Sequence, residues 1–106
     1  MRVFDHMGIP TQVPQPGERL VQATKTWVTD PKLHPFQVEW LRYQEGSPVP
    51  PILKNSPHIA FRVDDIAKES AGLEVILPPF PSVAGHVVGF YKTPDGAIVE
   101  LMVYGV

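Results

Sequence analysis

The sequence contains no cysteine among its 106 residues. This absence excludes a disulfide framework and every metal site built from thiolates. It is compatible with a reducing compartment, and we expect a cytoplasmic protein. No apolar run approaches the roughly 18 residues that a membrane-spanning helix needs, and the first residues lack the apolar segment of a signal peptide. We therefore expect no membrane partner.

An excess of charge of one sign is also lacking. The nine basic and eleven acidic residues are interspersed and give a formal net charge of −2. No basic patch favours nucleic acid as a partner, and no charge run favours a membrane surface. The length and the apolar fraction of 43% are ordinary for a globular protein with a modest core. We expect one domain over residues 1–106.

Proline is abundant, with 13 residues, and it clusters between segments that are typical of strands. It therefore indicates the connections of a β-rich fold. Strands are predicted at residues 2–9, 20–28, 36–43, 58–63, 74–77, 86–92 and 97–104. The turn at residues 93–96, Thr-Pro-Asp-Gly, suits a hairpin. Extended connections are expected at 11–18 and 45–57, and the loop 80–85 could lie over a pocket.

The segment between Pro57 and Asp64 carries the clearest pattern. Its side chains alternate, with Ile59, Phe61 and Val63 on one face and His58, Ala60 and Arg62 on the other. This period of two predicts a strand with one face on a hydrophobic layer. A short helix should follow, capped by Asp64 or Asp65 and running through Ala71 to Gly72.

Two histidines and two glutamates are the candidate functional residues. His58 begins the polar face of its strand, and His6 holds a similar place in a weaker copy of the pattern at residues 3–10. Glu39 and Glu100 lie inside later apolar strands. A carboxylate is rarely buried unless it is paired or binds a cation, because its desolvation is costly. The alternatives are packing or surface histidines and solvated glutamates on an open sheet face.

Imidazole and carboxylate ligands together suit a divalent transition metal such as Zn, Ni, Mn, Fe or Co, and the sequence leaves the choice among these metals open. Such a centre leaves positions for two neighbouring oxygens of a substrate. We predict that His6, Glu39, His58 and Glu100 are its ligands.

The order of the elements is strand, loop, strand, strand, then strand, helix and three strands. The second half, about 57–106, is β-α-β-β-β, and the first, about 1–46, is a copy whose helix is replaced by a proline-rich loop. With the segments FDHMGI at 4–9, PHIAFRVDDI at 57–66 and TPDGAIVEL at 93–101, the chain resembles the vicinal-oxygen-chelate superfamily. This superfamily includes glyoxalase I, methylmalonyl-CoA epimerase, extradiol dioxygenases and bleomycin-resistance proteins.

The resemblance implies an α+β fold of two paired β-α-β-β-β modules, the first lacking most or all of its helix, that curve around a cleft. Metal ligands in such proteins come from the first and last strands of each module, which here carry His6, Glu39, His58 and Glu100. The implied function is that of a metal-dependent lyase, isomerase or epimerase of glyoxalase type. It would act on a small carbonyl or carboxylate substrate through an enolate-like intermediate, with Glu39 or Glu100 as the catalytic base.

Three further residues are predicted to bind the substrate. Arg62 could clamp an anionic group, or it is an exposed edge arginine. Tyr43 and Phe90 could line the cleft, with core packing as the alternative for both.

The resemblance leaves a second function open, which is metal-free binding or sequestration of a small molecule, as in the bleomycin-resistance proteins. Extradiol oxygenation is disfavoured, because that chemistry usually uses two histidines and one carboxylate. We also expect a homodimer, because the shortened first module leaves sheet edges and apolar surface to cover.

Overall fold

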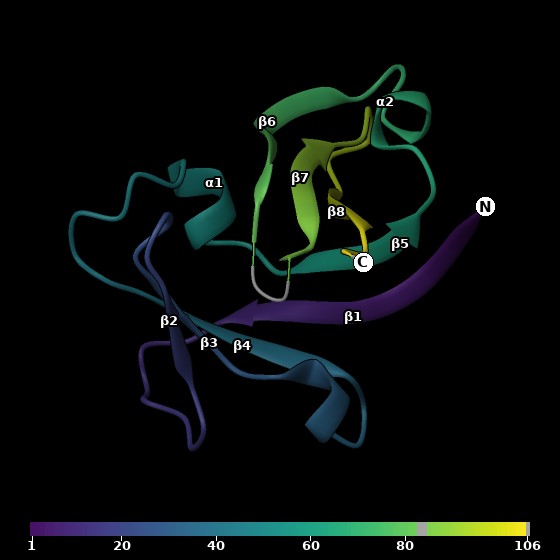
Figure 1. The fold of residues 1–106 in the computed structure, drawn as a ribbon. Coiled ribbons are helices and arrows are strands. Elements are labelled where there is room, and N and C mark those ends of the chain that lie inside the picture. Colours follow the sequence, from purple (N-terminus) through teal and green to yellow (C-terminus); the bar gives the residue numbers. More distant parts are fainter. Residues whose placement is uncertain (83–84, 106) are drawn as a thin grey trace.

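The computed structural model describes residues 1–82 and 85–105. Eight strands form one mixed sheet in the order β2-β3-β4-β1-β5-β8-β7-β6, and this sheet curls through space (Figure 1). The strands are β1 (Arg2–Pro10), β2 (Arg19–Val21), β3 (Thr26–Val28), β4 (Val38–Tyr43), β5 (His58–Val63), β6 (Glu74–Pro81), β7 (Val87–Lys92) and β8 (Ile98–Val103). The helices are short: η1 (Pro31–Leu33), α1 (Pro51–Lys54) and α2 (Ile66–Glu69). Among the described residues, no helix is long and apolar enough to cross a membrane.

The two halves of the sheet repeat one pairing scheme. At the centre, β1 pairs antiparallel with β5. Each of these strands has a parallel neighbour from its own half, β4 beside β1 and β8 beside β5. The outer strands, β3 and β2 on one side and β7 and β6 on the other, add antiparallel pairs. This arrangement is consistent with paired β-α-β-β-β modules, and the segment 11–18 in the first half contains no helix, as expected.

Alternation along the strands of the second half produces two apolar clusters on opposite faces. One contains Ala60, Val88, Phe90, Ile98 and Met102, with Val49 and Leu53 packed on it. The other contains Val63, Tyr91 and Leu101 under Ile66 of α2. Asp65 caps α2 by accepting a hydrogen bond from the Lys68 N–H. The helix ends at Glu69, two residues before the predicted end, and Gly72 follows with φ of 83°.

The segment 20–28 was predicted as one strand, and this prediction is wrong. The chain reverses between β2 and β3, where Lys25 takes φ of 49° and its N–H donates to the Gln22 carbonyl. The two short strands then pair antiparallel, with Leu20 opposite Trp27. The first half therefore contains three strands after its loop, which makes it more similar to the second half than the sequence indicated.

Other element boundaries also differ from the prediction. β4 begins at Val38 and not at Phe36, because Gln37 takes φ of 58° and interrupts the extended backbone. The connector 45–57 contains α1, whose Leu53 is only 2% exposed. β6 runs through its prolines to Pro81, which an edge strand tolerates because one row of its N–H groups needs no partner. Of the predicted loop 80–85, residues 83 and 84 lie outside the described residues.

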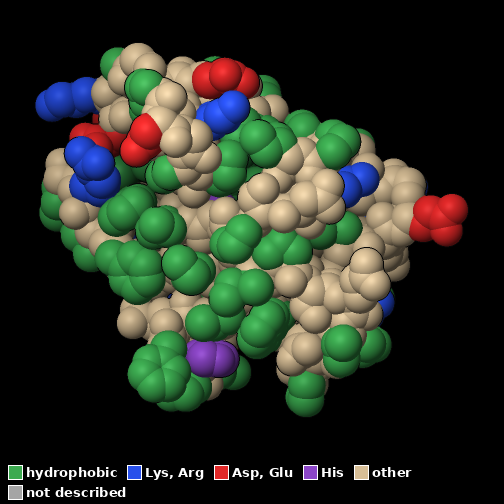
Figure 2. All heavy atoms as spheres, turned by 180° about the vertical axis from the view of Figure 1, so that it is seen from behind, with side chains coloured by type: hydrophobic (Ala, Val, Ile, Leu, Met, Phe, Trp, Pro, Cys, Tyr) green, Lys and Arg blue, Asp and Glu red, His purple; other side chains and the backbone are tan. Residues whose placement is uncertain are grey.

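Apolar side chains also remain on the surface. The large exposed ones are Met1, Val3, Phe4, Val13, Leu33, Phe36, Ile52, Val75 and Val87. Figure 2 shows the face opposite to that of Figure 1, where hydrophobic side chains gather across the middle and the charged ones lie mostly toward the upper edge. The homodimer expected from such a surface stays a prediction.

Candidate metal centre

The four central strands of the sheet bring the predicted ligands together. His6 lies on β1, Glu39 on β4, His58 on β5 and Glu100 on β8. One ligand atom from each residue lies within 4.8 Å of the others. The histidines are 2% and 1% exposed and Glu100 is 5% exposed. These residues form a buried cluster that could hold a metal ion.

The strand register explains why the four side chains meet. Residues directly opposite one another on paired strands project to the same face of the sheet. His6 lies opposite Ala60, which in turn lies opposite Glu100. In the next row, His58 lies opposite Gly8, which lies opposite Glu39. A small residue two positions after each histidine therefore makes room for the other histidine.

This pairing also has a signal in the sequence. The chain has His-Met-Gly at 6–8 and His-Ile-Ala at 58–60, so a His-x-small pattern occurs at the same place in each half. When two such segments pair antiparallel, each histidine lies opposite the other segment's small residue. The repeat therefore predicts the register as well as the ligands.

The nitrogen and oxygen atoms of the cluster approach each other closely. Nε2 of His6 lies 3.3 Å from Oε1 of Glu39 and 3.3 Å from Oε1 of Glu100. Nε2 of His58 lies 3.0 Å from the same Glu100 oxygen. The two imidazoles meet edge to face with centroids 5.9 Å apart, and His58 meets the Phe90 ring in the same way at 5.1 Å.

Several of these atoms are close but are not hydrogen-bonded. Nε2 of His6, both ring nitrogens of His58 and Oε1 of Glu100 are buried without a hydrogen-bond partner among the described residues. Buried polar atoms nearly always have partners, because desolvation without compensation is costly. Three of these atoms point into one small space, where a divalent cation would satisfy all of them. The donor set therefore fits a metal of the zinc, nickel, manganese, iron or cobalt type.

Asp5 was not among the predicted site residues, yet it contacts the cluster directly. Its Oδ2 lies 2.6 Å from Nδ1 of His6, and the Tyr104 hydroxyl donates a hydrogen bond to its other oxygen. A carboxylate on one ring nitrogen of a ligating histidine directs the lone pair of the other nitrogen to the metal. Asp5 can reach the adjacent ring because the β1–β5 register shifts between Phe4 and His6, which leaves Asp5 as a bulge residue.

The charges of the cluster shift its pKa values in opposite directions. Burial alone would lower the pKa of His6, but contacts with Glu100 and Glu39 outweigh burial and raise it to about 11. Burial would raise the pKa of Glu100, but the His58 and His6 imidazoles lower it to about 2. The pKa of Glu39 is raised, mainly by burial and further by the negative charge of Glu100. Without metal, the cluster therefore holds a proton on His6 that a cation would displace.

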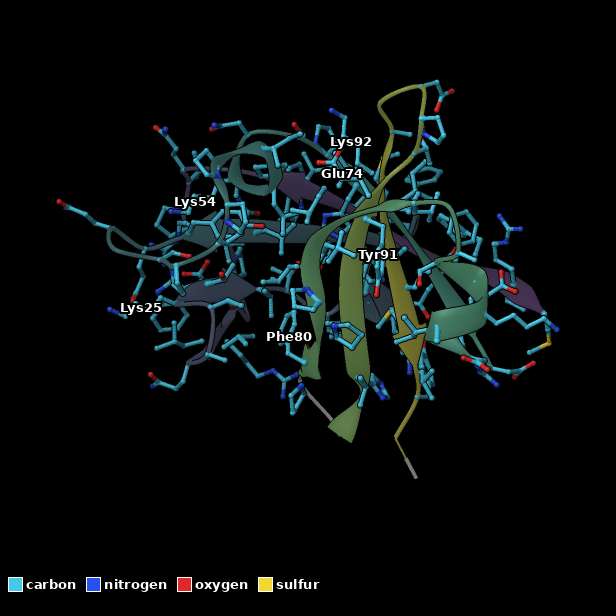
Figure 3. All side chains as sticks on the ribbon, turned by 90° about the horizontal axis from the view of Figure 1, so that it is seen from above. Lys25, Lys54, Glu74, Phe80, Tyr91 and Lys92 are labelled. Atoms are coloured by element: carbon cyan, nitrogen blue, oxygen red, sulfur yellow. The ribbon has the colours of Figure 1, made fainter. Side chains whose placement is uncertain are left out.

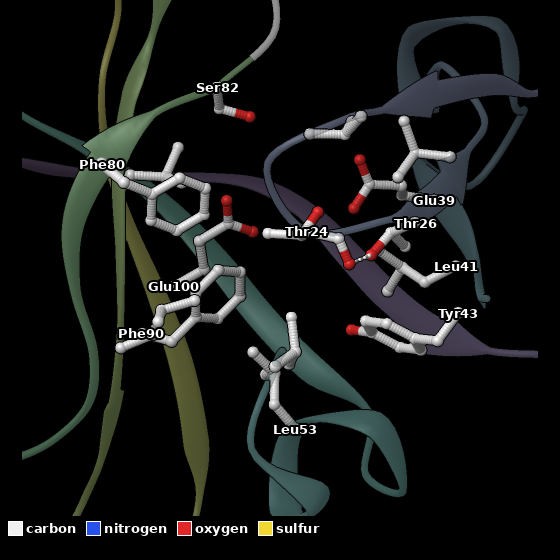
Figure 4. Close-up of a pocket in the computed structure, with 15 residues that line it drawn as sticks. Thr24, Thr26, Glu39, Leu41, Tyr43, Leu53, Phe80, Ser82, Phe90 and Glu100 are labelled. Carbon is white, nitrogen blue, oxygen red and sulfur yellow. Dashed lines mark hydrogen bonds between the residues drawn. The ribbon is translucent and has the colours of Figure 1, made fainter. Parts of the chain in front are cut away.

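A cleft opens beside the two glutamates. Figure 4 shows Phe80, Phe90 and Glu100 on one wall and Glu39, Leu41 and Tyr43 on the facing wall. The cleft is small, with a cavity volume of about 50 Å³. The rings of Phe80 and Phe90 stack with centroids 6.4 Å apart.

The three residues predicted to bind substrate have different positions. Tyr43 and Phe90 line the cleft. Arg62 is exposed and does not line it, and its guanidinium lies 4.8 Å above the Tyr104 ring. The structure therefore places two of these residues beside the glutamates and the third on the outside of the molecule.

The sequence matches no protein-family model, and it matches no curated protein.

Proposed function

We propose that the protein is a metal-dependent enzyme of the vicinal-oxygen-chelate kind, a lyase, isomerase or epimerase that acts on a small carbonyl compound. The observation that carries this proposal is the convergence of His6, Glu39, His58 and Glu100 with unsatisfied ring nitrogens and a carboxylate oxygen at their centre. The symmetric pairing of the two halves and the resemblance of the sequence segments support it. Each half contributes one histidine from its first strand and one glutamate from its last.

His6, Glu39, His58 and Glu100 would hold a divalent metal, which would supply a Lewis acid to stabilise negative charge on a substrate oxygen. The protein supplies the proton transfer. Glu39 is the better base, because its raised pKa brings it closer to neutral pH, where general acid–base groups are most effective. Glu100 has a lowered pKa and stays an anionic ligand. The cleft that leads to these two glutamates has mostly apolar walls.

The test begins with the metal content of the purified protein, measured by plasma mass spectrometry. We expect about one divalent metal per chain, as a single four-ligand site requires. His58→Ala should remove it, whereas His34→Ala, a matched change outside the cluster, should not. Glu39→Gln should lose proton exchange at the carbon beside a substrate carbonyl and retain bound substrate. A His58→Ala protein that keeps its full metal content would contradict the proposal.

The second candidate function is metal-free binding of a small molecule in the same cleft. The observation that favours it is the aromatic lining, with Tyr43, Phe80 and Phe90 around one hollow. In this case ligands would raise the melting temperature equally with and without a strong chelator. Under the leading proposal, the chelator should abolish that increase.

A further inference from the structure

Two hollows reach the His/Glu cluster, and they differ in charge. The cleft of Figure 4 touches Glu39 and Glu100. A second hollow touches His6 and Glu39, and its walls carry Arg19 and Lys32 together with acidic residues. A substrate can therefore lie in an apolar environment or in a charged one, and its own charge should decide which hollow it occupies.

The cleft carries no cation among its described lining residues. Apart from the two glutamates, its walls are aliphatic and aromatic side chains and a few hydroxyl groups. Lys25, in the β2–β3 turn, and Lys54, at the end of α1, lie apart from Phe80 in the view of Figure 3, and neither lines the cleft. The Lys54 ammonium donates to the Ser47 carbonyl at 2.7 Å. An anionic substrate in the cleft would therefore have no counter-charge from the protein.

The charge of the metal-loaded centre also disfavours an anionic substrate. Two carboxylates balance one divalent cation when both imidazoles are neutral, so the four ligands and the cation have no net charge, and Asp5 beside His6 adds a negative charge. A further anion would leave an unbalanced negative charge between apolar walls, where desolvated charge is unfavourable. A neutral molecule brings no such penalty, and its apolar part gains from burial against Phe80 and Phe90.

Tyr43 offers a hydroxyl group that can donate a hydrogen bond to an uncharged substrate. Burial raises the pKa of its phenol, and the charges of Glu39 and Glu100 raise it further. The hydroxyl therefore stays protonated and can donate a hydrogen bond to an uncharged oxygen. The cleft thus offers the Tyr43 hydroxyl as a hydrogen-bond donor together with a broad apolar surface.

We propose that the substrate is an uncharged, compact, mainly apolar carbonyl compound whose body lies in the cleft between Tyr43, Phe80 and Phe90, with two neighbouring oxygens toward the metal centre. This inference rests on the proposed function and narrows it, because it excludes the carboxylate substrates that the sequence left open. The anion clamp expected from Arg62 is not part of this cleft.

The test uses two probes that share one pair of oxygens, a phenyl-substituted α-diketone and its analogue with a carboxylate at the para position of the ring. Metal-loaded protein, with its metal content measured first, is titrated with each probe by calorimetry. The neutral diketone should bind at least about tenfold more tightly, because the carboxylate meets no cation. Equal or tighter binding of the anion would overturn the inference, and so would no binding of the diketone at millimolar concentration.

Charge variants show which hollow is occupied. Thr24→Lys places a cation on the cleft wall and should reduce the difference in affinity between the neutral and the anionic probe. Val21→Lys is the substitute variant if Thr24→Lys folds poorly. Gln22→Lys adds a cation in the same turn but outside the cleft lining, so the difference in affinity between the two probes should stay unchanged. Loss of diketone affinity in Lys32→Ala would place the substrate in the charged hollow and overturn the inference.

Failure of the proposed function is distinguishable from failure of this inference. A chain that takes up no metal contradicts the proposed function and the placement of the two substrate oxygens, but it does not contradict the preference of the cleft for an uncharged compound. The same pair of probes then tests the inference on the metal-free protein, because the lack of cations in the cleft does not depend on the metal. Preference for the anion would overturn the inference there too.

Discussion

Gly8 lies opposite His58 in the antiparallel pair of β1 and β5, and the His58 ring fills the space that a side chain at position 8 would need. A Cβ on Gly8 would lie 2.1 Å from Cε1 and 2.3 Å from Nε2 of His58. No real Cβ contact is so short, so the ring would have to move. The absence of a side chain at position 8 therefore makes room for the His58 ring in the His/Glu cluster.

Gly8→Ala should accordingly reduce metal affinity by at least about tenfold, since it displaces one of four ligands. Overpacking should also lower the free energy of unfolding by about 1–3 kcal/mol. Ala60→Gly is the matched control, because it removes an atom opposite His6 and adds none. Metal titration against a chelating dye measures both variants. If the Gly8→Ala protein binds metal as tightly as the wild type, metal binding does not require the His58 ring at its present position.

Asp5→Asn should weaken metal binding about ten- to a hundredfold, because the change removes the carboxylate that orients the His6 ring. Tyr104→Phe should have a smaller effect, since it removes only the hydrogen bond to Asp5. Asp64→Asn is the control, as this residue is exposed and, within residues 1–82 and 85–105, pairs only with the N-terminus. The same dye competition measures all three, and equal affinities would rule out the role given to Asp5.

Metal binding should release about one proton per ion near neutral pH, and affinity should rise about tenfold per pH unit. The reason is the His6 pKa, which Glu100 and Glu39 raise to about 11 against the effect of burial. His6 is therefore protonated in the metal-free protein and must lose its proton to bind, so lower pH opposes binding. Calorimetry in buffers of different ionisation enthalpy counts the protons. A count of zero would contradict a protonated His6 in the metal-free cluster.

Leu53→Ala should lower the free energy of unfolding by about 2–5 kcal/mol, because it leaves a cavity where α1 packs on the sheet. The neighbouring Ile52 is 38% exposed, and its change to Ala should cost less than about 1 kcal/mol. Urea denaturation followed by tryptophan fluorescence measures both. Equal effects would show that α1 is not anchored through Leu53.

Much of this architecture can be predicted from the sequence, because it depends on local patterns. Period-two alternation identifies β5, and Thr-Pro-Asp-Gly identifies the last hairpin, where Gly96 takes φ of 97°. The four clustered residues were found because histidines and glutamates interrupt apolar strands at corresponding places in both halves. Long-range pairing then brings them together, and the strand order required for this is implied by the repeat.

What the sequence did not reveal depends on backbone conformations without a residue signature. Lys25 and Gln37 take positive φ values usually adopted by glycine, so the β2–β3 turn and the start of β4 were missed. The bulge at Asp5 depends on the pairing of β1 with β5, and without it the contact with His6 could not be foreseen. The charge of the cleft likewise emerges only from distant segments folded together.

The most direct test of the metal centre is crystal diffraction from the metal-loaded protein, recorded at the absorption edge of the bound metal. We predict one anomalous peak about 2.0–2.2 Å from Nε2 of His6, Nε2 of His58 and one carboxylate oxygen each of Glu39 and Glu100. A peak elsewhere on the chain, or no peak among these four side chains, would contradict the claim that His6, Glu39, His58 and Glu100 bind a metal.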